Sequence, residues 1–324
     1  MTVMVVVDAL ESLDPSLDTS VGLMHAAQDA GHQVWVTRPG DLDVVDARPR
    51  ALAKAITLTP SEPAGGCRWT VPAPWCRVVA TEHVWLDRAD AVFMWAEPPV
   101  DERYRHATFV LDLLDPARTA VVNDPRGLRV CSEHLLPLQF PDLIASTILT
   151  AEPATIRGFV ADHDDCVLKP VDGFGGRGVL RLRPDDPNLA SLLEISTANG
   201  SRPVLVQEYL PQVEGGNKRV FMLDGRPQAA VYRYPLGDDF RIGHPSTPAP
   251  VTARDRQICR ALAPTLALHG IRVAGLDVIG PYLIEVNITS PGALRKADAL
   301  LGTRLCAEVL DHVLPSARMT GESA

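Results

Sequence analysis

The sequence of 324 residues lacks the marks of several protein classes. Lys and Arg number 31 against 40 Asp and Glu, so the net charge is −9, and no run of like charges occurs. Such a chain has no electrostatic footprint for nucleic acid or for an anionic membrane surface. No apolar run approaches a membrane span, and the opening MTVMVVVDAL is too short for a secretory signal. We therefore expect a soluble cytoplasmic protein that binds neither nucleic acid nor membrane.

Cysteine is scarce, and the constellations of nucleophilic catalysis are missing. The six cysteines are scattered and form no C-x-x-C pair, so we expect reduced, mostly packed thiols. The sequence shows no Ser-His-Asp or Cys-His set and no counterpart of the H-R-D and D-F-G motifs of protein kinases. These absences disfavour covalent catalysis by a side chain and a protein-kinase activity.

The composition is that of a folded chain. Hydrophobic residues make up 46% and charged residues 22%, and the length allows two or three packed domains. Apolar runs at 3–7 and 34–36 flank a helical pattern at 20–30, and this β-α-β unit predicts a parallel sheet covered by helices. Residues 59–76, rich in Pro and Gly, are expected to be irregular. Further patterns predict strands at 91–95, 119–122, 204–210 and 219–223, and helices at 104–114, 128–136 and 188–199.

The stretch VLKPVDGFGGRGVLRL, residues 167–182, has the pattern of a phosphate-binding loop. A short apolar strand leads into Lys169, then into a loop with glycines at 173, 175, 176 and 178, and then into a second strand. Glycines remove the Cβ atoms that keep backbone N–H groups from an anion, and they allow positive φ values. The pattern G-x-G-x-x-G is present, but a dinucleotide site needs a helix after the loop, and VLRLRP alternates as a strand does. The stretch predicts a flap over a nucleoside triphosphate. The alternative is a glycine-rich hairpin without a ligand.

A second pattern lies at residues 275–291, GLDVIGPYLIEVNITSP, which predict two strands joined by a tight turn. In that hairpin Asp277 faces Glu285 across the ladder, and Asn287 lies on the same face. Two facing carboxylates repel, so we expect a cation between them. Mg²⁺ fits, because proteins commonly hold it by one or two carboxylates together with substrate phosphates.

The alternative is structural: Asp277 and Glu285 pair separately with Arg272 and Arg295. The glycine loop in the same chain favours the metal. Flap and metal together predict ATP chemistry.

With these motifs in view, the sequence resembles the bacterial type of glutathione synthetase, an ATP-grasp carboxylate–amine ligase. The matching blocks follow the family's order at 97–114, 121–129, 167–182, 206–211, 217–225 and 275–291. The resemblance implies an α/β fold of the α+β ATP-grasp type. It implies an N-terminal parallel α/β domain at 1–122 and two ATP-grasp lobes, 123–203 and 204–324, that clamp the nucleotide. It also implies ATP and Mg²⁺ or Mn²⁺ as cofactors, small carboxylate and amine substrates, and a homo-oligomer.

The same resemblance implies a role for each matching residue. For ATP these residues are Lys169, Gly173, Gly175, Gly176, Gly178, Gln207, Glu208, Leu210 and His134. For the metal they are Asp277, Glu285 and Asn287, for catalysis Arg219 and Arg295, and for the substrates Arg241, Trp95 and Ser290. In this family ATP phosphorylates a carboxylate, and an amine then attacks the acyl phosphate.

The sequence departs from the family at positions where substrate is expected to bind. Trp95 and Ala96 stand in place of a basic pair, and RIGHPSTPAP at 241–250 replaces a glycine-rich lid. An indole in place of a cation favours an apolar group on the acid substrate, unless Trp95 is a core residue. His134 replaces an expected lysine and is either a phosphate contact or a solvated helix residue.

The leading hypothesis is therefore an ATP-dependent ligase that forms an amide through an acyl phosphate, with γ-glutamylcysteine and glycine as the default pair. The departures predict that this pair is used poorly. One alternative is a biosynthetic ligase for another acid and amine. A non-catalytic ATP-binding regulator and a kinase-like phosphotransferase are the others.

Overall fold

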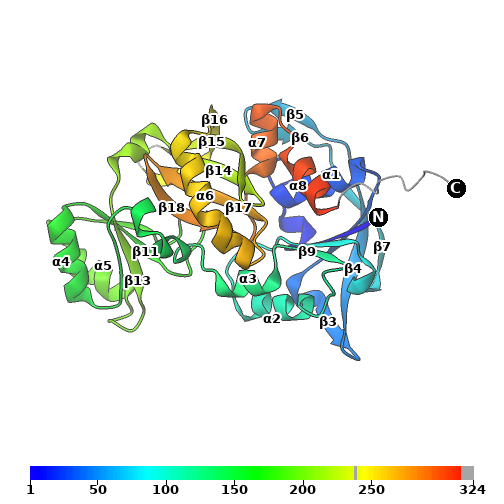
Figure 1. Ribbon diagram of the computed structural model, residues 1–324, viewed down its shortest axis with the longest axis horizontal. Coiled ribbons are helices and arrows are strands. Elements are labelled where there is room, and N and C mark those ends of the chain that lie inside the picture. The colour runs from blue at the N-terminus through cyan, green and yellow to red at the C-terminus, as the bar shows by residue number, and fades with distance from the viewer. Residues whose placement is uncertain (237–238, 315–324) are drawn as a thin grey trace.

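The computed structural model describes residues 1–236 and 239–314. Three of its β-sheets lie in a row along the long axis of the molecule (Figure 1). The N-terminal sheet is at one end, a four-stranded sheet is at the other, and a five-stranded sheet lies between them. Helices pack on all three, so the architecture is α/β, as predicted. Among the described residues no helix is both long and apolar enough to cross a membrane.

The N-terminal sheet is mixed, which corrects the expectation of a parallel sheet. Strands β2, β1, β8 and β9 pair in parallel, whereas β3, β4 and β7 add an antiparallel arm. Most of β7 is exposed, so its sequence lacks the alternation that marks a half-buried strand. The strands are β1 (Thr2–Val6), β2 (Gln33–Thr37), β3 (Leu42–Val45), β4 (Arg48–Leu58), β7 (Cys76–Trp85), β8 (Ala91–Met94) and β9 (Ala120–Val122). The segment 59–76 holds a small hairpin, β5 (Glu62–Gly65) and β6 (Arg68–Thr70), rather than only irregular chain.

Aspartates begin the helices of this region. Asp18, Asp101 and Asp124 each accept a hydrogen bond from a backbone N–H in the first turn that follows, an N-cap that satisfies a donor the helix cannot. The helices are α1 (Thr19–Asp29), α2 (Glu102–Leu111) and α3 (Pro125–Val130). The helix predicted at 128–136 was therefore misplaced. Asp124 and Pro125 start α3 earlier, and Glu133 lies beyond it, where its carbonyl accepts from Val286 N.

The four-stranded sheet forms a small lobe with its own core. Its order is β10-β13-β11-β12, all antiparallel, and Ile156, Leu168 and Val206 pack inside it. The elements are β10 (Thr147–Thr150), α4 (Pro153–His163), β11 (Cys166–Pro170), β12 (Leu180–Leu182), α5 (Leu189–Ser196) and β13 (Val204–Glu208). The strand, glycine loop, strand arrangement is thus observed. Strand β13 pairs in this sheet, although the sequence placed it in the following lobe.

The five-stranded sheet carries the predicted hairpin. Its order is β16-β15-β14-β17-β18, and α6 lies across it (Figure 1). A capping box between Thr252 and Asp255 starts α6. The elements are β14 (Asn217–Leu223), β15 (Arg226–Leu236), β16 (Asp239–Ala249), α6 (Ala253–Leu268), β17 (Val273–Ile279) and β18 (Tyr282–Asn287).

The last two helices return to the N-terminal end of the molecule. Helices α7 (Leu294–Leu301) and α8 (Leu305–Val313) pack on α1 (Figure 1). One core joins Phe93 and Val21 to Val309, and another joins Met4 to Leu276 of β17. The N-terminal and five-stranded sheets therefore share cores, whereas the small lobe does not.

Candidate active site

A pocket of about 240 Å³ lies between the small lobe and the five-stranded sheet. Most of the residues predicted from the sequence meet there. Its lining includes Lys169, Gly175, Gly176, Gln207, Glu208, Leu210, Arg219, Arg241, Asp277, Glu285 and Asn287. These residues come from five segments up to 118 positions apart, so the fold gathers them into one site.

The hairpin β17–β18 contains the predicted facing pair, but its register shifts between Asp277 and Val278, which the sequence did not indicate. Asp277 lies opposite Glu285, and Asn287 lies opposite Gly275. The amide Nδ2 of Asn287 donates to the Gly275 carbonyl at 3.1 Å. That bond fixes the amide and leaves Oδ1 as its ligand-binding end.

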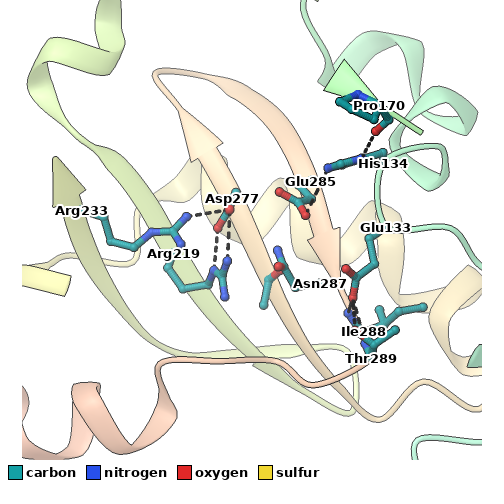
Figure 2. A network of polar contacts seen from close by, with 11 residues as sticks. Glu133, His134, Pro170, Arg219, Arg233, Asp277, Glu285, Asn287, Ile288 and Thr289 are labelled. Atoms are coloured by element: carbon teal, nitrogen blue, oxygen red, sulfur yellow. Dashed lines mark hydrogen bonds and ion pairs between the residues drawn. The ribbon is translucent and has the colours of Figure 1, made fainter. Parts of the chain in front are cut away.

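Two buried arginines hold Asp277 (Figure 2). Arg219 Nε lies 2.5 Å from Oδ1, and Arg233 Nη2 lies 2.6 Å from Oδ2. Burial alone would raise the pKa of Asp277, but the two guanidinium groups outweigh it and hold that pKa well below its ordinary range. The ion pairs proposed from sequence are not those observed, because Arg272 pairs with Asp224 at 3.0 Å.

Arg233 is a site residue that the sequence analysis missed. It lies on β15 opposite Asn217 and donates to the Asn217 Oδ1 at 2.7 Å. An uninterrupted count from the Asp224-Gly225 turn would place Arg233 opposite Gly216, on the other face of the sheet from Arg219. The register shift between Phe221 and Met222 brings Arg233 opposite Asn217 and onto the face of Arg219.

Glu285 is held from the other side by His134 (Figure 2). The ring Nε2 lies 3.5 Å from Glu285 Oε1, and Nδ1 lies 3.0 Å from the Pro170 carbonyl. Burial lowers the pKa of His134, but Glu285 more than compensates and the net shift is upward. His134 is 7% exposed and lies outside any helix, so the alternative of a solvated helix residue is wrong.

The neighbouring Glu133 ties this segment to the end of β18. Its Oε1 accepts from the backbone N of Ile288 at 2.6 Å and of Thr289 at 2.9 Å, and from the Thr289 hydroxyl (Figure 2). The segment from Ser132 to His134 thus positions the β17–β18 hairpin.

Lys169 and the glycine loop form the small-lobe side of the pocket. Lys169 is 9% exposed, and its burial lowers the pKa of the ammonium group while Glu285 and Asp277 oppose that shift. Gly175, Gly176 and Gly178 have φ values of +58°, +72° and +72°, the left-handed region that glycine tolerates. Arg241 Nη1 lies 3.5 Å from the Gly176 carbonyl, so the loop and β16 meet over the pocket.

The pocket also has an apolar wall, of which the sequence analysis named only Leu210. Its members are Val167, Val179, Leu210, Val213, Ile279 and Ile284, beside the ring of Tyr209. They come from both sheets and face each other only in the folded chain. Apolar walls with a few polar groups are typical of nucleotide and cofactor pockets.

Three predicted site residues lie elsewhere. Trp95 is 3% exposed and packs edge-on against Phe93 in the N-terminal core, which is the core alternative for this residue. Ser290 hydrogen-bonds Glu97, whose carboxyl lies near Asp18 and Asp8. Arg295 lies in a separate cavity under α7.

The donors suit a hard cation. Among the described residues no group of three or more His, Cys, Asp and Glu side chains is arranged to hold a metal. The set here has two carboxylates and one amide oxygen, and Mg²⁺ commonly takes one or two carboxylates and completes its shell with water and substrate phosphates. Asp277, Glu285 and Asn287 supply ligand oxygens of these kinds. The Asp277 carboxylate is also paired with Arg219 and Arg233.

Family models and solved structures define the class of protein. The N-terminal domain of prokaryotic glutathione synthetase matches residues 1–129, and the ATP-grasp domain of the same enzyme matches 133–302. The ATP-grasp ligase PsnB complexed with minimal precursor has a TM-score of 0.63 at 20% identity, over 96% of this chain and 98% of that one. D-cycloserine synthetase DcsG has a TM-score of 0.60 at 19% identity, over 94% and 99%. The fold is that of the ATP-grasp ligases.

Relatives in sequence narrow the class to a family. The glutathione synthetase of Thermosynechococcus vestitus is 46% identical over 314 residues, which are 96% of this chain and 98% of that protein. The glutathione synthetase of Synechocystis sp. is 42% identical over 94% and 96%, and that of Xanthomonas campestris pv. campestris 35% over 97% and 98%. The chain belongs to the prokaryotic glutathione synthetase family and is an ATP-dependent carboxylate–amine ligase. The family predicted from the sequence is confirmed.

Proposed function

We propose that this ligase joins the carboxylate of γ-glutamylcysteine to the amine of glycine, with ATP and Mg²⁺ or Mn²⁺, to form glutathione. The observation that carries the proposal is the meeting of Lys169, Arg219 and the face of Asp277 and Glu285 in one pocket under the glycine loop. Phosphoryl transfer needs positioning and neutralisation of charge more than covalent help from side chains. The lack of a nucleophilic set in the sequence agrees with this requirement.

The nucleotide is assigned to the small-lobe side. The apolar wall around Val167 and Ile284 would hold the adenine, with the backbone of Glu208 and Leu210 at its edge. Lys169 and the N–H groups of the glycine loop would then face the phosphates. Asp277, Glu285 and Asn287 would hold the metal ion, which would neutralise phosphate charge there.

The reaction has two steps. The acid carboxylate attacks the γ-phosphorus of ATP, the bond to the β-phosphate oxygen breaks, and an acyl phosphate and ADP form. The amine then attacks the acyl carbon, phosphate leaves, and the amine's proton passes to solvent or phosphate. Arg219 and Arg233, whose side chains are 6% and 14% exposed, would stabilise charge that develops on the transferring group. Arg241 lies against the loop and would contact the phosphates or the acid.

Product formation tests the proposal directly. ADP release, phosphate release and the mass of the product are measured with γ-glutamylcysteine and glycine together and with each alone. We expect phosphate release to need both partners and glutathione to accumulate. A phosphorylated product that persists would mark a kinase, and ATP binding without turnover would mark a regulator.

A substrate panel tests the alternative of another acid and amine. The same assay is run with a series of carboxylates and amines at equal concentration. The burial of Trp95 removes the sequence argument for an altered acid pocket at that position, so we expect γ-glutamylcysteine to be a preferred acid. An efficiency below about 10⁴ M⁻¹s⁻¹ for the glutathione pair, with a better pair elsewhere in the panel, would overturn this choice of substrates.

A further inference from the structure

A second cavity of about 300 Å³ lies among α1, α7, α8 and the β5–β6 hairpin, elements that Figure 1 shows together at one end of the molecule. His25 of α1, Trp69 of the hairpin, and Arg295 at the start of α7 line it. Among the described residues none lines both this cavity and the nucleotide pocket. We call it the α7 cavity.

The α7 cavity contains a buried cation with neutral partners. Arg295 is 2% exposed, and its guanidinium lies 4.7 Å from the centre of the Trp69 ring. Nε donates to the Pro15 carbonyl and Nη2 to the Ser61 hydroxyl, both at 3.0 Å. Within the described chain no carboxylate forms an ion pair with it, and burial lowers its pKa to about 10 despite acidic groups further off. A buried charge is costly unless it is paired, so this site favours an anion.

A buried imidazole beside Arg295 also lacks a partner. His25 is 7% exposed, and its Nε2 has no hydrogen-bond partner among the described residues. Burial and the nearby Arg295 lower the pKa of His25 to about 4, so its ring is neutral near pH 7. Buried polar atoms without partners are rare, and each calls for an explanation. A ligand in the α7 cavity would lie beside both Arg295 and His25, because both residues line it.

The other charges of the lining decide the kind of anion. Asp29 and Asp311 are exposed members of the lining, and Arg304 is an exposed cation there. Asp298 is engaged by the backbone N–H groups of Leu305 and Cys306 at the start of α8. A dianion such as phosphate would face this acidic surplus. A monocarboxylate that also carries an ammonium group suits it, because the ammonium would face Asp29 and Asp311.

We propose that the α7 cavity is a second binding site, for a small α-amino acid. Its carboxylate pairs with Arg295 and His25, and its ammonium group lies toward Asp29 and Asp311. The volume, at the low end of small-molecule pockets, sets the size of the ligand. The site stands apart from the substrates of the ligase reaction and does not depend on their identity.

The α7 cavity is connected to the nucleotide pocket through a short segment. Arg219 Nη1 donates to the Gly292 carbonyl at 3.3 Å, and Arg295 follows three residues later. A ligand on Arg295 therefore acts on the segment that supports Arg219. We expect saturation of the α7 cavity to change the KM for ATP about fivefold or more, a common size for coupling between sites. An unchanged KM would overturn this coupling.

Calorimetric titration of the full chain with the common α-amino acids, one at a time, tests the site. Three variants locate any binding: His25→Ala in the α7 cavity, His32→Ala as a matched control that follows α1 outside the cavity, and Arg219→Ala in the nucleotide pocket. We expect at least one amino acid to bind the wild type, His32→Ala and Arg219→Ala alike. His25→Ala should weaken that binding about tenfold or more, the usual cost of losing a hydrogen bond to a charged group.

A second variant in the α7 cavity distinguishes a loss of binding from a folding defect caused by His25→Ala. Ala307→Trp fills the α7 cavity without removing a polar group, and should abolish binding while thermal melting shows a folded chain. Binding that is lost in Arg219→Ala and kept in His25→Ala would place the ligand in the nucleotide pocket and overturn the proposal. So would the absence of binding by every amino acid, or stronger binding of inorganic phosphate.

Discussion

The nucleotide pocket and the α7 cavity both contain buried arginine side chains, but the guanidinium groups have different partners in the two places. Arg219 and Arg233 share the carboxylate of Asp277, whereas the hydrogen-bond and ring partners of Arg295 in the described part of the chain are neutral. In the nucleotide pocket each guanidinium has a carboxylate partner before any ligand binds. In the α7 cavity the guanidinium of Arg295 has no counter-ion among the described residues. The difference separates cations that a carboxylate already positions from a cation that awaits an anion.

The largest expected effect comes from removing the carboxylate that Arg219 and Arg233 share. Asp277→Asn leaves two buried guanidinium groups without their shared carboxylate, and should lower the free energy of unfolding by about 3 to 5 kcal/mol. Denaturant unfolding of the ligand-free chain measures this change. Asp43→Asn is the matched control, because its pair with Arg50 is exposed and should contribute at most about 1 kcal/mol. Equal losses in the two variants would show that the Asp277 cluster is not a stabilising unit.

Next in size is the loss of turnover when a charge facing the phosphates or the metal is removed. Lys169→Ala and Glu285→Ala should each slow ADP release about 100-fold to 1,000-fold, since each removes one electrostatic contact from the pocket. Arg183→Ala, on the same lobe but half exposed, should keep the wild-type rate. The metal assignment would fail if Glu285→Ala stayed active at limiting Mg²⁺.

A smaller effect is expected in the backbone of the glycine loop. Gly178 has a φ of +72°, and an added Cβ would lie 2.9 Å from Pro170 Cγ, so Gly178→Ala should cost about 1 to 3 kcal/mol of loop strain and raise the KM for ATP. Thermal melting measures the loss of stability, and the dependence of the rate on ATP concentration measures the KM for ATP. Gly158→Ala is the control, because it lies in helix α4 with open space around it and should stabilise by about 0.5 to 1 kcal/mol. An unaltered KM for ATP in Gly178→Ala would argue that the loop does not cover the nucleotide.

The parts of this protein that the sequence predicts are those built from local spacing. The glycine loop between β11 and β12 follows from strand alternation on either side. The facing of Asp277 and Glu285 was also predicted, but Ile279 lies opposite Tyr282, and only a register shift between Asp277 and Val278 brings Glu285 opposite Asp277. The family followed from blocks in a fixed order. Arg233 escaped prediction because a register shift separates it from the turn.

Features that depend on distant segments were not predictable. Arg295 donates to Pro15, 280 positions away, and nothing near it in sequence indicates that partner. From the sequence alone Trp95 could be either a pocket residue or a core residue. Its packing in the core of the N-terminal sheet decides for the second. The expected homo-oligomer and the cytoplasmic location stay predictions, since a single chain tests neither.

The smallest expected effect concerns Glu97, which hydrogen-bonds Ser290 and lines neither of the two regions. Burial, with Asp18, Asp8 and Glu133 nearby, raises the pKa of Glu97 from its ordinary 4.5 to about 7. Between these values the folded state holds a proton that the unfolded state has lost, so stability is full below pH 4.5 and falls as pH rises toward 7. The residue as a whole is exposed, and solvent screening should keep the total change below about 1 kcal/mol.

Glu97→Gln tests this pH dependence, because it removes the titrating group and keeps the shape of the side chain. The free energy of unfolding of the variant, relative to wild type, should rise from pH 4.5 to pH 7 and then level off. Glu62→Gln, on the exposed strand β5, serves as the control and should give a curve parallel to that of the wild type. A Glu97→Gln curve that also runs parallel would mean that the Glu97 carboxyl is as well solvated in the folded protein as in the unfolded chain.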